Sequence, residues 1–311
     1  MKSIIKSLKI VASILIIMSA TYCFAQGQGD SLTYRIETVD GNIYSGQIIA
    51  SDSVNITLYE DQLGQINILR SQIKEMYPID PKKIKEGKYW FDNPQATRYF
   101  YAPNGYALQA GEGYYQNVWV LFNSFAVGIT DHFSLGAGVV PLFLFAGAPT
   151  PVWVTPKFSI PISKDEISIG AGALAGAIVG EEKSGFGILY GLSTFGSKDK
   201  NISLGLGYGY AGGDWANTPM INLSAMIRTG AQGYFLTENY FIRSGGTTTA
   251  IIWLGGRQII RDAGLDYGLM IPIYSEMEDF IAIPWLGITI PFGNQHIRAE
   301  RQKGNHVSPA N

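Results

Sequence analysis

The residues most able to do chemistry are five charged side chains within otherwise apolar, strand-like stretches: Lys157, Glu238, Arg243, Arg257 and Asp266. Charges set into an apolar wall can form a charged constriction or a site for a polar solute. Glu238 and Arg257 fall in consecutive predicted strands, so they could pair, and Lys157 and Asp266 would add to the same lining. A structural role is the alternative, in which the same charges close the interior with salt bridges.

Nucleophilic catalysis has little support in the sequence. Membrane-embedded hydrolases resembling outer-membrane phospholipase or lipid A deacylase need a histidine beside a serine on the barrel wall. The three histidines are His132, in a predicted turn, and His296 and His306, in the C-terminal tail. The sequence contains no HExxH, P-loop or GxSxG motif. We therefore predict a protein that is not an enzyme and that uses no metal and no cofactor.

The stretch that would position these charges runs from Tyr114 to Phe292 and reads as a succession of amphipathic strands. In 202–210, every second side chain is large and apolar, and those between are Ser or Gly. Such alternation puts one set of side chains on each face of a strand. A barrel in lipid requires an apolar outer face opposite a small or polar inner face, and its closure leaves no unpaired backbone edge. A cationic side chain facing lipid at the midplane would cost roughly 2–4 kcal/mol, so the five charges should point inward.

The predicted lipid face is strongly apolar in several strands. It comprises Phe133, Leu135, Ala137 and Val139; Ile167, Ile169, Ala171 and Ala173; Ile221, Leu223, Ala225 and Ile227; and Phe280, Ala282, Pro284, Leu286, Ile288, Ile290 and Phe292. Aromatic residues at strand ends could form interfacial girdles, namely Tyr114, Tyr115, Trp153, Trp215, Tyr274 and Trp285. The alternative fold is a soluble β-sandwich, whose outer face would be charged. The face opposite the apolar stripe is instead Gly, Ser and Ala, which favours the membrane barrel.

About twelve strands are predicted, an even number as single-chain outer-membrane barrels require. Their approximate ranges are 97–109, 114–129, 133–145, 152–162, 166–179, 185–196, 202–211, 220–228, 233–243, 248–259, 264–274 and 280–292. Pro103 and Gly105 interrupt the first of them. Tight turns alternate with mostly longer, Gly-richer loops, and short turns belong at the periplasmic rim. This arrangement places both termini in the periplasm and provides no long constriction loop.

The N-terminus indicates export. Three lysines precede an apolar run over 10–18 and a cleavage point after Ala25, which together predict a signal peptide over 1–25. The run is too short to span a bilayer, which takes about 20 apolar residues. Lipidation at Cys23 is the alternative, although the residue before it fits lipoprotein processing poorly. Simple cleavage leaves a mature chain without cysteine, which excludes disulfides, thiol catalysis and zinc–thiolate sites.

The composition fits an envelope barrel. Charged residues make up 15% of the chain, below the roughly 25% typical of soluble domains. The net charge of −2 provides no basic field for nucleic acid. The mean hydropathy of +0.08 is far below that of a helical membrane protein and normal for a barrel, whose polar lumen offsets its lipid face.

Residues 26–80 have the pattern of a separate module. Five short strands are predicted in it, over 32–36, 43–49, 54–59, 65–69 and 73–76. Its glycines and apolar residues have a spacing that resembles small Sm-like domains found ahead of bacterial envelope proteins: Gly41, Gly46, Leu58, Gly64, Ile66, Ile68 and Ile73. The resemblance implies a small SH3- or Sm-like β-barrel, and a periplasmic address argues against RNA. A charged linker over 81–96 follows, which could touch anionic lipid or be a solvated connector.

Two further resemblances concern the large domain. The runs 89–94, 97–100 and 111–117 are similar to those of uncharacterised predicted outer-membrane proteins of Bacteroidota. The last strand, which ends at Phe292, resembles the C-terminal signal read by the barrel-assembly machinery, except that a polar tail over 293–311 follows it. These resemblances imply the outer membrane of a Gram-negative cell and assign no activity.

The sequence therefore predicts an all-β protein: a transmembrane antiparallel β-barrel over 97–292 that follows a small β-barrel module, with module and tail in the periplasm. The leading function is passage or binding of a small solute in a charged, porin-like lumen. The alternative is a plugged structural or envelope-anchoring barrel whose module docks a periplasmic protein. Outer-membrane lipid and the barrel-assembly machinery are the other expected partners, and nucleic acid is not one.

Overall fold

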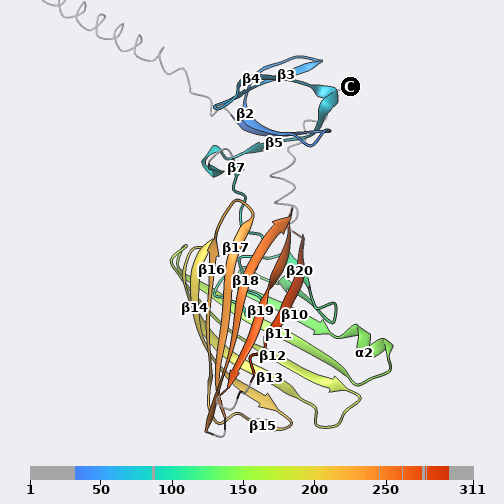
Figure 1. Cartoon of the computed structure of the whole chain (residues 1–311), viewed down its shortest axis with the longest axis vertical. Coiled ribbons are helices and arrows are strands. Elements are labelled where there is room, and N and C mark those ends of the chain that lie inside the picture. Colours follow the sequence, from blue (N-terminus) through green and yellow to red (C-terminus); the bar gives the residue numbers. More distant parts are fainter. Residues whose placement is uncertain are drawn as a thin grey trace, which may run out of the picture. The chain divides into compact units, whose positions relative to one another are not determined.

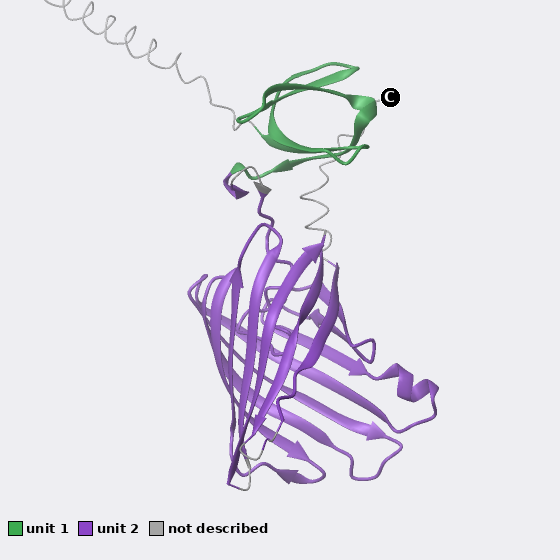
Figure 2. Ribbon diagram, in the orientation of Figure 1, with its two compact units in different colours: residues 1–81, 306–311 green, residues 82–305 purple. Residues whose placement is uncertain are grey.

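The computed structural model describes residues 32–85, 88–244, 246–260, 262–274, 277 and 279–293. The predicted signal peptide and nearly all of the predicted polar tail lie outside these ranges. The described chain forms two compact units, divided after Pro81, which Figure 2 shows in green and purple. Among the described residues, no helix is long and apolar enough to cross a membrane.

The first unit is a five-stranded antiparallel sheet. Its strands are β1 (Thr33–Thr38), β2 (Ile43–Ser51), β3 (Asn55–Glu60), β4 (Gly64–Leu69) and β5 (Ile73–Ile79), in the order β4-β3-β2-β1-β5, with the 3₁₀ turn η2 (Arg70–Gln72) before β5. Ile36, Ile56, Leu58 and Ile68 form its buried core. Gly41, with φ of +86°, turns the chain between β1 and β2. The five strands agree with the sequence prediction, and the Sm- or SH3-like assignment stays a prediction.

The second unit is a closed barrel of twelve antiparallel strands (Figure 1). The strands are β8 (Glu112–Val118), β9 (Phe122–Gly128), β10 (Phe133–Val139), β11 (Thr150–Ser163), β12 (Ile167–Val179), β13 (Phe186–Gly196), β14 (Lys200–Ala211), β16 (Met220–Arg228), β17 (Gly233–Ser244), β18 (Thr247–Ile260), β19 (Ala263–Tyr274) and β20 (Ile283–Gly293). Each pairs with the next along the chain, and β20 pairs with β8 to close the ring. The sequence prediction of an all-β transmembrane barrel is confirmed.

Smaller elements flank the ring. They are η3 (Pro81–Lys83), the hairpin of β6 (Ile84–Lys85) and β7 (Lys88–Tyr89), the helix α2 (Pro141–Phe145) and the short strand β15 (Asp214–Trp215). Because Glu112 pairs with Gly293, the barrel begins and ends at one rim, as an even number of strands requires. The tight turns lie at this rim, which we call the turn rim, and the opposite one is the loop rim. The periplasmic location of the turn rim stays a prediction.

The predicted first strand is wrong. Residues 97–109 are not in a barrel strand, and the barrel begins at Glu112. The predicted second strand, 114–129, is instead the hairpin β8–β9, so two errors cancel and the count remains twelve. The hairpin turns at Trp119 and Val120, whose φ values of +51° and +64° are unusual for non-glycine residues. Trp119 stabilises this turn, because its indole nitrogen donates to the carbonyl oxygen of Pro284 at 2.7 Å.

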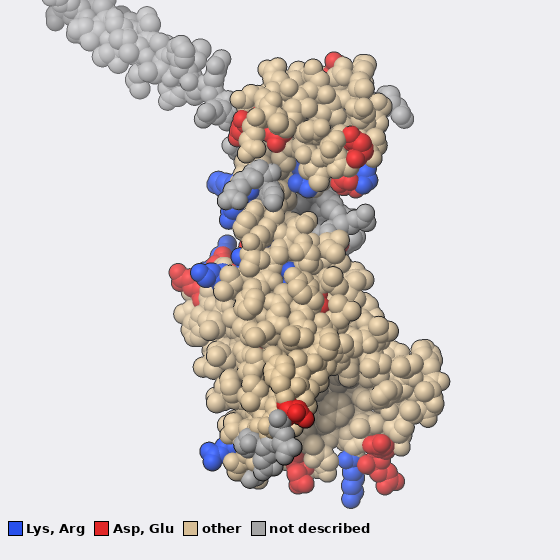
Figure 3. Space-filling model, in the orientation of Figure 1, with Lys and Arg blue, Asp and Glu red and all other residues tan. Residues whose placement is uncertain are grey.

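The barrel exposes its apolar side chains and buries its small ones. In β14, Ile202, Leu204 and Leu206 are 46%, 52% and 55% exposed, while the alternating Asn201 and Ser203 are buried. On the face of the barrel shown in Figure 3, charged groups gather near the two ends. The outside therefore suits hydrocarbon, as the alternation predicted.

Two strand faces differ from the predicted pattern. The inward face of β17 carries Tyr234, Leu236 and Glu238, all buried, and is not a row of small residues. Trp153 and Trp285, expected in interfacial girdles, are also buried inside the barrel. Large residues can point inward here because a segment of the chain occupies the lumen and gives them a packing surface.

Candidate luminal site

Residues 93–108, which we call the luminal segment, run inside the ring of strands between β7 and β8 (Figure 1). Most of the segment is buried. Its hydrogen bonds reach β8, β11, β13, β14 and each strand from β16 to β20. A segment bonded to strands on opposite sides of a ring must cross its interior, so the luminal segment is a plug.

The plug is held by one buried carboxylate between two buried guanidinium groups. Asp266 lies between Arg257, at 2.5 Å, and Arg98, at 2.9 Å, and we call these three residues the Arg–Asp cluster. All three side chains are essentially inaccessible to solvent. Arg98 comes from the luminal segment, whereas Arg257 and Asp266 come from β18 and β19. The cluster therefore ties the plug to the wall.

Backbone carbonyl groups accept most of the remaining hydrogen bonds of the cluster, and among the described residues only Nε of Arg98 in the cluster has no acceptor. Arg257 donates to the carbonyl oxygens of Gln95, at 3.0 Å, and Tyr99, at 2.5 Å. Arg98 donates to those of Tyr99 and Phe100, each at 2.8 Å, and also to the side chain of Thr289 on β20. These acceptors matter because the cluster has two positive charges and one negative charge, and unpaired buried N–H groups are costly.

The predicted pairing of Glu238 with Arg257 is wrong. In the register of β17 and β18, Glu238 lies opposite Trp253, whereas in the next pair Arg257 lies opposite Asp266. Glu238 instead accepts hydrogen bonds from the backbone amides of Tyr101, at 2.9 Å, and Ala102, at 3.0 Å. Its other oxygen accepts from the Tyr240 hydroxyl at 2.8 Å. Glu238 is thus a second anchor for the plug.

Arg243 does not point into the lumen, contrary to the sequence prediction. It lies near the loop rim, at the end of β17, and its side chain is exposed. The inward residues of β17 are the even-numbered ones, such as Glu238 and Tyr240, so Arg243 has the opposite parity. Among its described contacts, its backbone oxygen accepts a hydrogen bond from the Thr218 hydroxyl.

Lys157 is the remaining predicted lumen residue, and it lies inside. Its ammonium is buried and donates to the carbonyl oxygen of Tyr106, in the plug, at 2.7 Å. None of the ion pairs found in the described part of the chain includes Lys157. Lys157 therefore differs from the Arg–Asp cluster in being a buried cation without a carboxylate.

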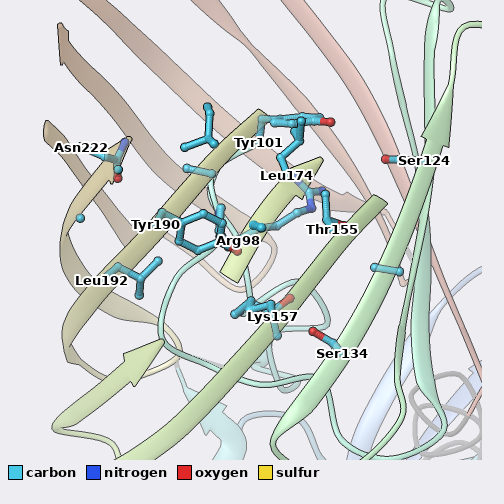
Figure 4. Close-up of a pocket in the computed structure, with 18 of the residues that line it drawn as sticks. Arg98, Tyr101, Ser124, Ser134, Thr155, Lys157, Leu174, Tyr190, Leu192 and Asn222 are labelled. Carbon is cyan, nitrogen blue, oxygen red and sulfur yellow. The ribbon is translucent and has the colours of Figure 1, made fainter. Parts of the chain in front are cut away.

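Lys157 lines a cavity of about 180 Å³ that the plug leaves open. Figure 4 shows labelled lining side chains from several strands, with Thr155 and Lys157 from β11, Ser134 from β10, and Tyr190 and Leu192 from β13. The lining is mostly apolar and includes the side chains of Leu108, Trp153, Leu174, Ile188, Leu192 and Met220. The cavity thus combines a mainly apolar lining with one unpaired cation, and it can accommodate a small ligand.

Aromatic rings form a further contact between plug and wall. Trp285 on β20 lies 5.9 Å from the ring of Phe100, 4.9 Å from Trp119 and 6.0 Å from Trp253. These are edge-on contacts, each contributing about 0.5–1.5 kcal/mol beyond the area buried. This cluster gives Trp285, one of the two buried tryptophans, its packing partners.

Arg98 and Gln95 are the site residues that sequence reasoning missed. Arg98 falls in the predicted strand over 97–109, and Gln95 falls in the predicted linker over 81–96. A signal was present, because Pro103 and Gly105 make the stretch a poor barrel strand. Nothing in the alternation of the chain, however, indicates that such a stretch enters the lumen.

Comparisons with known proteins find a structural likeness. No protein-family model and no curated protein matches the sequence. Among solved structures, the chain is similar to the outer-membrane expressed OmpT of Vibrio cholerae, with a TM-score of 0.32 and 10% identity. The similarity covers 85% of this chain and 95% of that chain. The fold itself is of the outer-membrane type, and the likeness assigns no activity. The resemblance to Bacteroidota proteins stays a prediction.

The prediction that the chain is not an enzyme is corrected. It rested on missing motifs alone, and the likeness to OmpT, at a TM-score of 0.32 and 10% identity, neither establishes nor excludes an enzymatic activity. Motifs recognise known catalytic arrangements, whereas a lumen can bring together reactive groups from distant strands. Among the described residues, no group of three or more potential metal-ligating side chains occurs.

Proposed function

We propose that this protein is a closed outer-membrane barrel that binds a small solute in its lumen and does not provide an open pore. The observation that carries the proposal is the luminal segment, which crosses the interior and bonds to strands around most of the ring. The charges that could have lined a conducting channel are used instead to anchor it. Asp266, Arg257 and Glu238 all face the plug.

The binding part of the proposal is supported by the cavity around Lys157. Ligand sites are typically concave, mostly apolar and supplied with a few placed polar groups, and this cavity has those features. A purely structural barrel is the second candidate, favoured by the many anchoring bonds of the plug. Docking of a periplasmic protein by residues 26–80 stays a prediction.

Planar-bilayer recordings test the closed state. We expect the purified protein to give no stepwise current above the detergent control, because the plug occupies the lumen. Arg257→Ala removes bonds to Asp266, Gln95 and Tyr99, so this variant should show intermittent currents. Steady channels from the unaltered protein, with an ion selectivity that Arg257→Ala changes, would instead establish open passage.

A further inference from the structure

The barrel wall is unusually low along one side. β8, β9 and β10 have seven residues each, whereas β11 has fourteen and β12 thirteen. At a rise of about 3.4 Å per residue and a tilt of about 40°, seven residues span roughly 18 Å along the barrel axis. The apolar band of such barrels is about 25 Å tall. Strands of this height cannot span that band, so at least one of their ends lies within the hydrocarbon.

The edge of this low wall is apolar. Two segments form it, the turn at Trp119 and Val120 between β8 and β9, and helix α2 after β10, and we call them together the low edge. Val120 is 83% exposed and Phe145 in α2 is 84% exposed. Residues 139–149 contain no charged side chain. Exposed apolar groups gathered in this way suit contact with acyl chains and not with water.

The cavity lies directly behind the low wall. Ser124 and Ala126 of β9 and Ser134 of β10 are among its lining residues. Across the sheet, Ser134 pairs with Lys157, and Lys157 pairs with Gly172, which pairs with Tyr190. The buried ammonium therefore lies in a row that begins at the low wall. This row is near the turn-rim end of β10, so an occupant that passes over the low edge crosses the rows of Trp153 and Thr155 before it reaches the ammonium.

The ammonium of Lys157 has unused donor capacity. Lysine has three N–H donors, and the Tyr106 carbonyl is the acceptor found for it among the described residues. A carboxylate would supply both the missing charge and the missing acceptors. Leu174, Ile188 and Leu192 lie on the same cavity and provide an apolar surface for an attached chain.

We propose that the cavity binds a single-chain anionic amphiphile, an alkyl carboxylate, that enters sideways from the bilayer over the low edge. The carboxylate pairs with the Lys157 ammonium, and the alkyl chain lies along Leu174 and Ile188. A cavity of about 180 Å³ holds on the order of ten water-sized groups, which corresponds to a chain of about eight to ten carbons. This inference rests on the proposed function and names the class of its ligand.

Equilibrium binding of isotopically labelled decanoate to the full-length protein in a non-ionic detergent tests the inference. Lys157→Met keeps the volume and removes the charge, so it should weaken decanoate binding by about thirtyfold or more. Lys157→Arg should retain binding. Ser134→Leu fills part of the cavity but keeps the charge of Lys157, and it should also weaken decanoate binding. Heat-modified migration on gels verifies that each variant is folded.

Two comparisons make the outcome decisive. Decyltrimethylammonium has the same chain with a cationic head, and it should not compete with decanoate. Equal decanoate binding by the unaltered protein and by Lys157→Met, or competition by the cation, would overturn the inference. If the protein is electrically silent but does not bind decanoate, only the inference about the ligand is overturned, and the closed barrel is not. A conducting protein would overturn the proposed function itself.

The entry route has its own readout. In vesicles preloaded with decanoate, Leu144→Asp places a charge on the low edge and should slow the association of decanoate several-fold. Its equilibrium affinity in detergent should be unchanged, because Leu144 is not a cavity residue. An unchanged association rate would show that the ligand does not pass over this edge.

Discussion

Asp266→Asn is expected to destabilise the barrel by about 3–5 kcal/mol, the largest effect of any single substitution considered for this chain. The carboxylate of Asp266 is the sole negative charge of the Arg–Asp cluster, between Arg98 and Arg257. Without it, two buried guanidinium groups would remain side by side with no counter-charge. We expect the luminal segment to detach from β19 before the barrel itself unfolds.

Urea unfolding of the purified protein in detergent micelles measures this effect. The control is Asp214→Asn, which removes an exposed carboxylate from β15 near the loop rim and should change the unfolding free energy by less than about 0.5 kcal/mol. An Asp266→Asn protein as stable as the control would show that the cluster does not hold the plug.

Glu238→Ala has the second largest expected effect, about 2–5 kcal/mol. One oxygen of Glu238 accepts from the amides of both Tyr101 and Ala102, and no water is expected to replace it in so buried a position. Removing the acceptor leaves two buried N–H groups unpaired. Because each such group costs about 1–3 kcal/mol, the loss is comparable to that of breaking a salt bridge.

Hydrogen exchange localises this second effect. The amides of Tyr101 and Ala102 should exchange at least tenfold faster in Glu238→Ala, while amides of β12, four strands away from β17 in the ring, should keep their protection. The matched control is Glu181→Ala, at an exposed position in a loop. If exchange accelerates equally in all strands, Glu238 supports the whole barrel and is not a specific anchor of the plug.

The architecture of the barrel could be read from the sequence because the solvent on its outer face is hydrocarbon. In a closed antiparallel ring, alternation in stretches such as β14 means that one face meets lipid and the other faces the lumen. The pattern therefore predicted Ile202 and Leu204 outside and Ser203 inside. From β10 onward the turns also separated the strands correctly, whereas the total of twelve depended on the two errors before β10 cancelling each other. The module was similarly readable, since its short apolar strands are separated by short polar turns such as the one at Gly41.

The pairing of the charges was harder to predict. Arg257 and Asp266 are both four residues from the turn between β18 and β19, so counting back from the turn would have placed them opposite each other. Glu238 was assigned to Arg257 because the two strands are consecutive, which fixes proximity but not register. A shift of a few residues changes the partner of every side chain along the strand.

The luminal segment could not be predicted from strand patterns. Tyr99 and Phe100 look like strand residues, and barrel strands also contain such pairs. Their burial depends on contacts with wall residues more than a hundred positions later, for example the hydrogen bond between Tyr99 and Asn201. The same long-range packing explains why Tyr234 and Leu236 of β17 point inward, although small side chains were expected on the inner face.

Cysteine accessibility tests most directly whether residues 93–108 fill the lumen. Cys23 is the only cysteine in the sequence, so Cys23→Ser provides a background without thiols. Ala102→Cys changes a buried residue of the plug very little in size, and Ala216→Cys lies at an exposed position of a loop as its control. In the folded protein, we predict that a hydrophilic maleimide labels Ala102→Cys at least a hundredfold more slowly than Ala216→Cys, and equally fast after denaturation. Equal labelling in the folded state would contradict the plugged barrel.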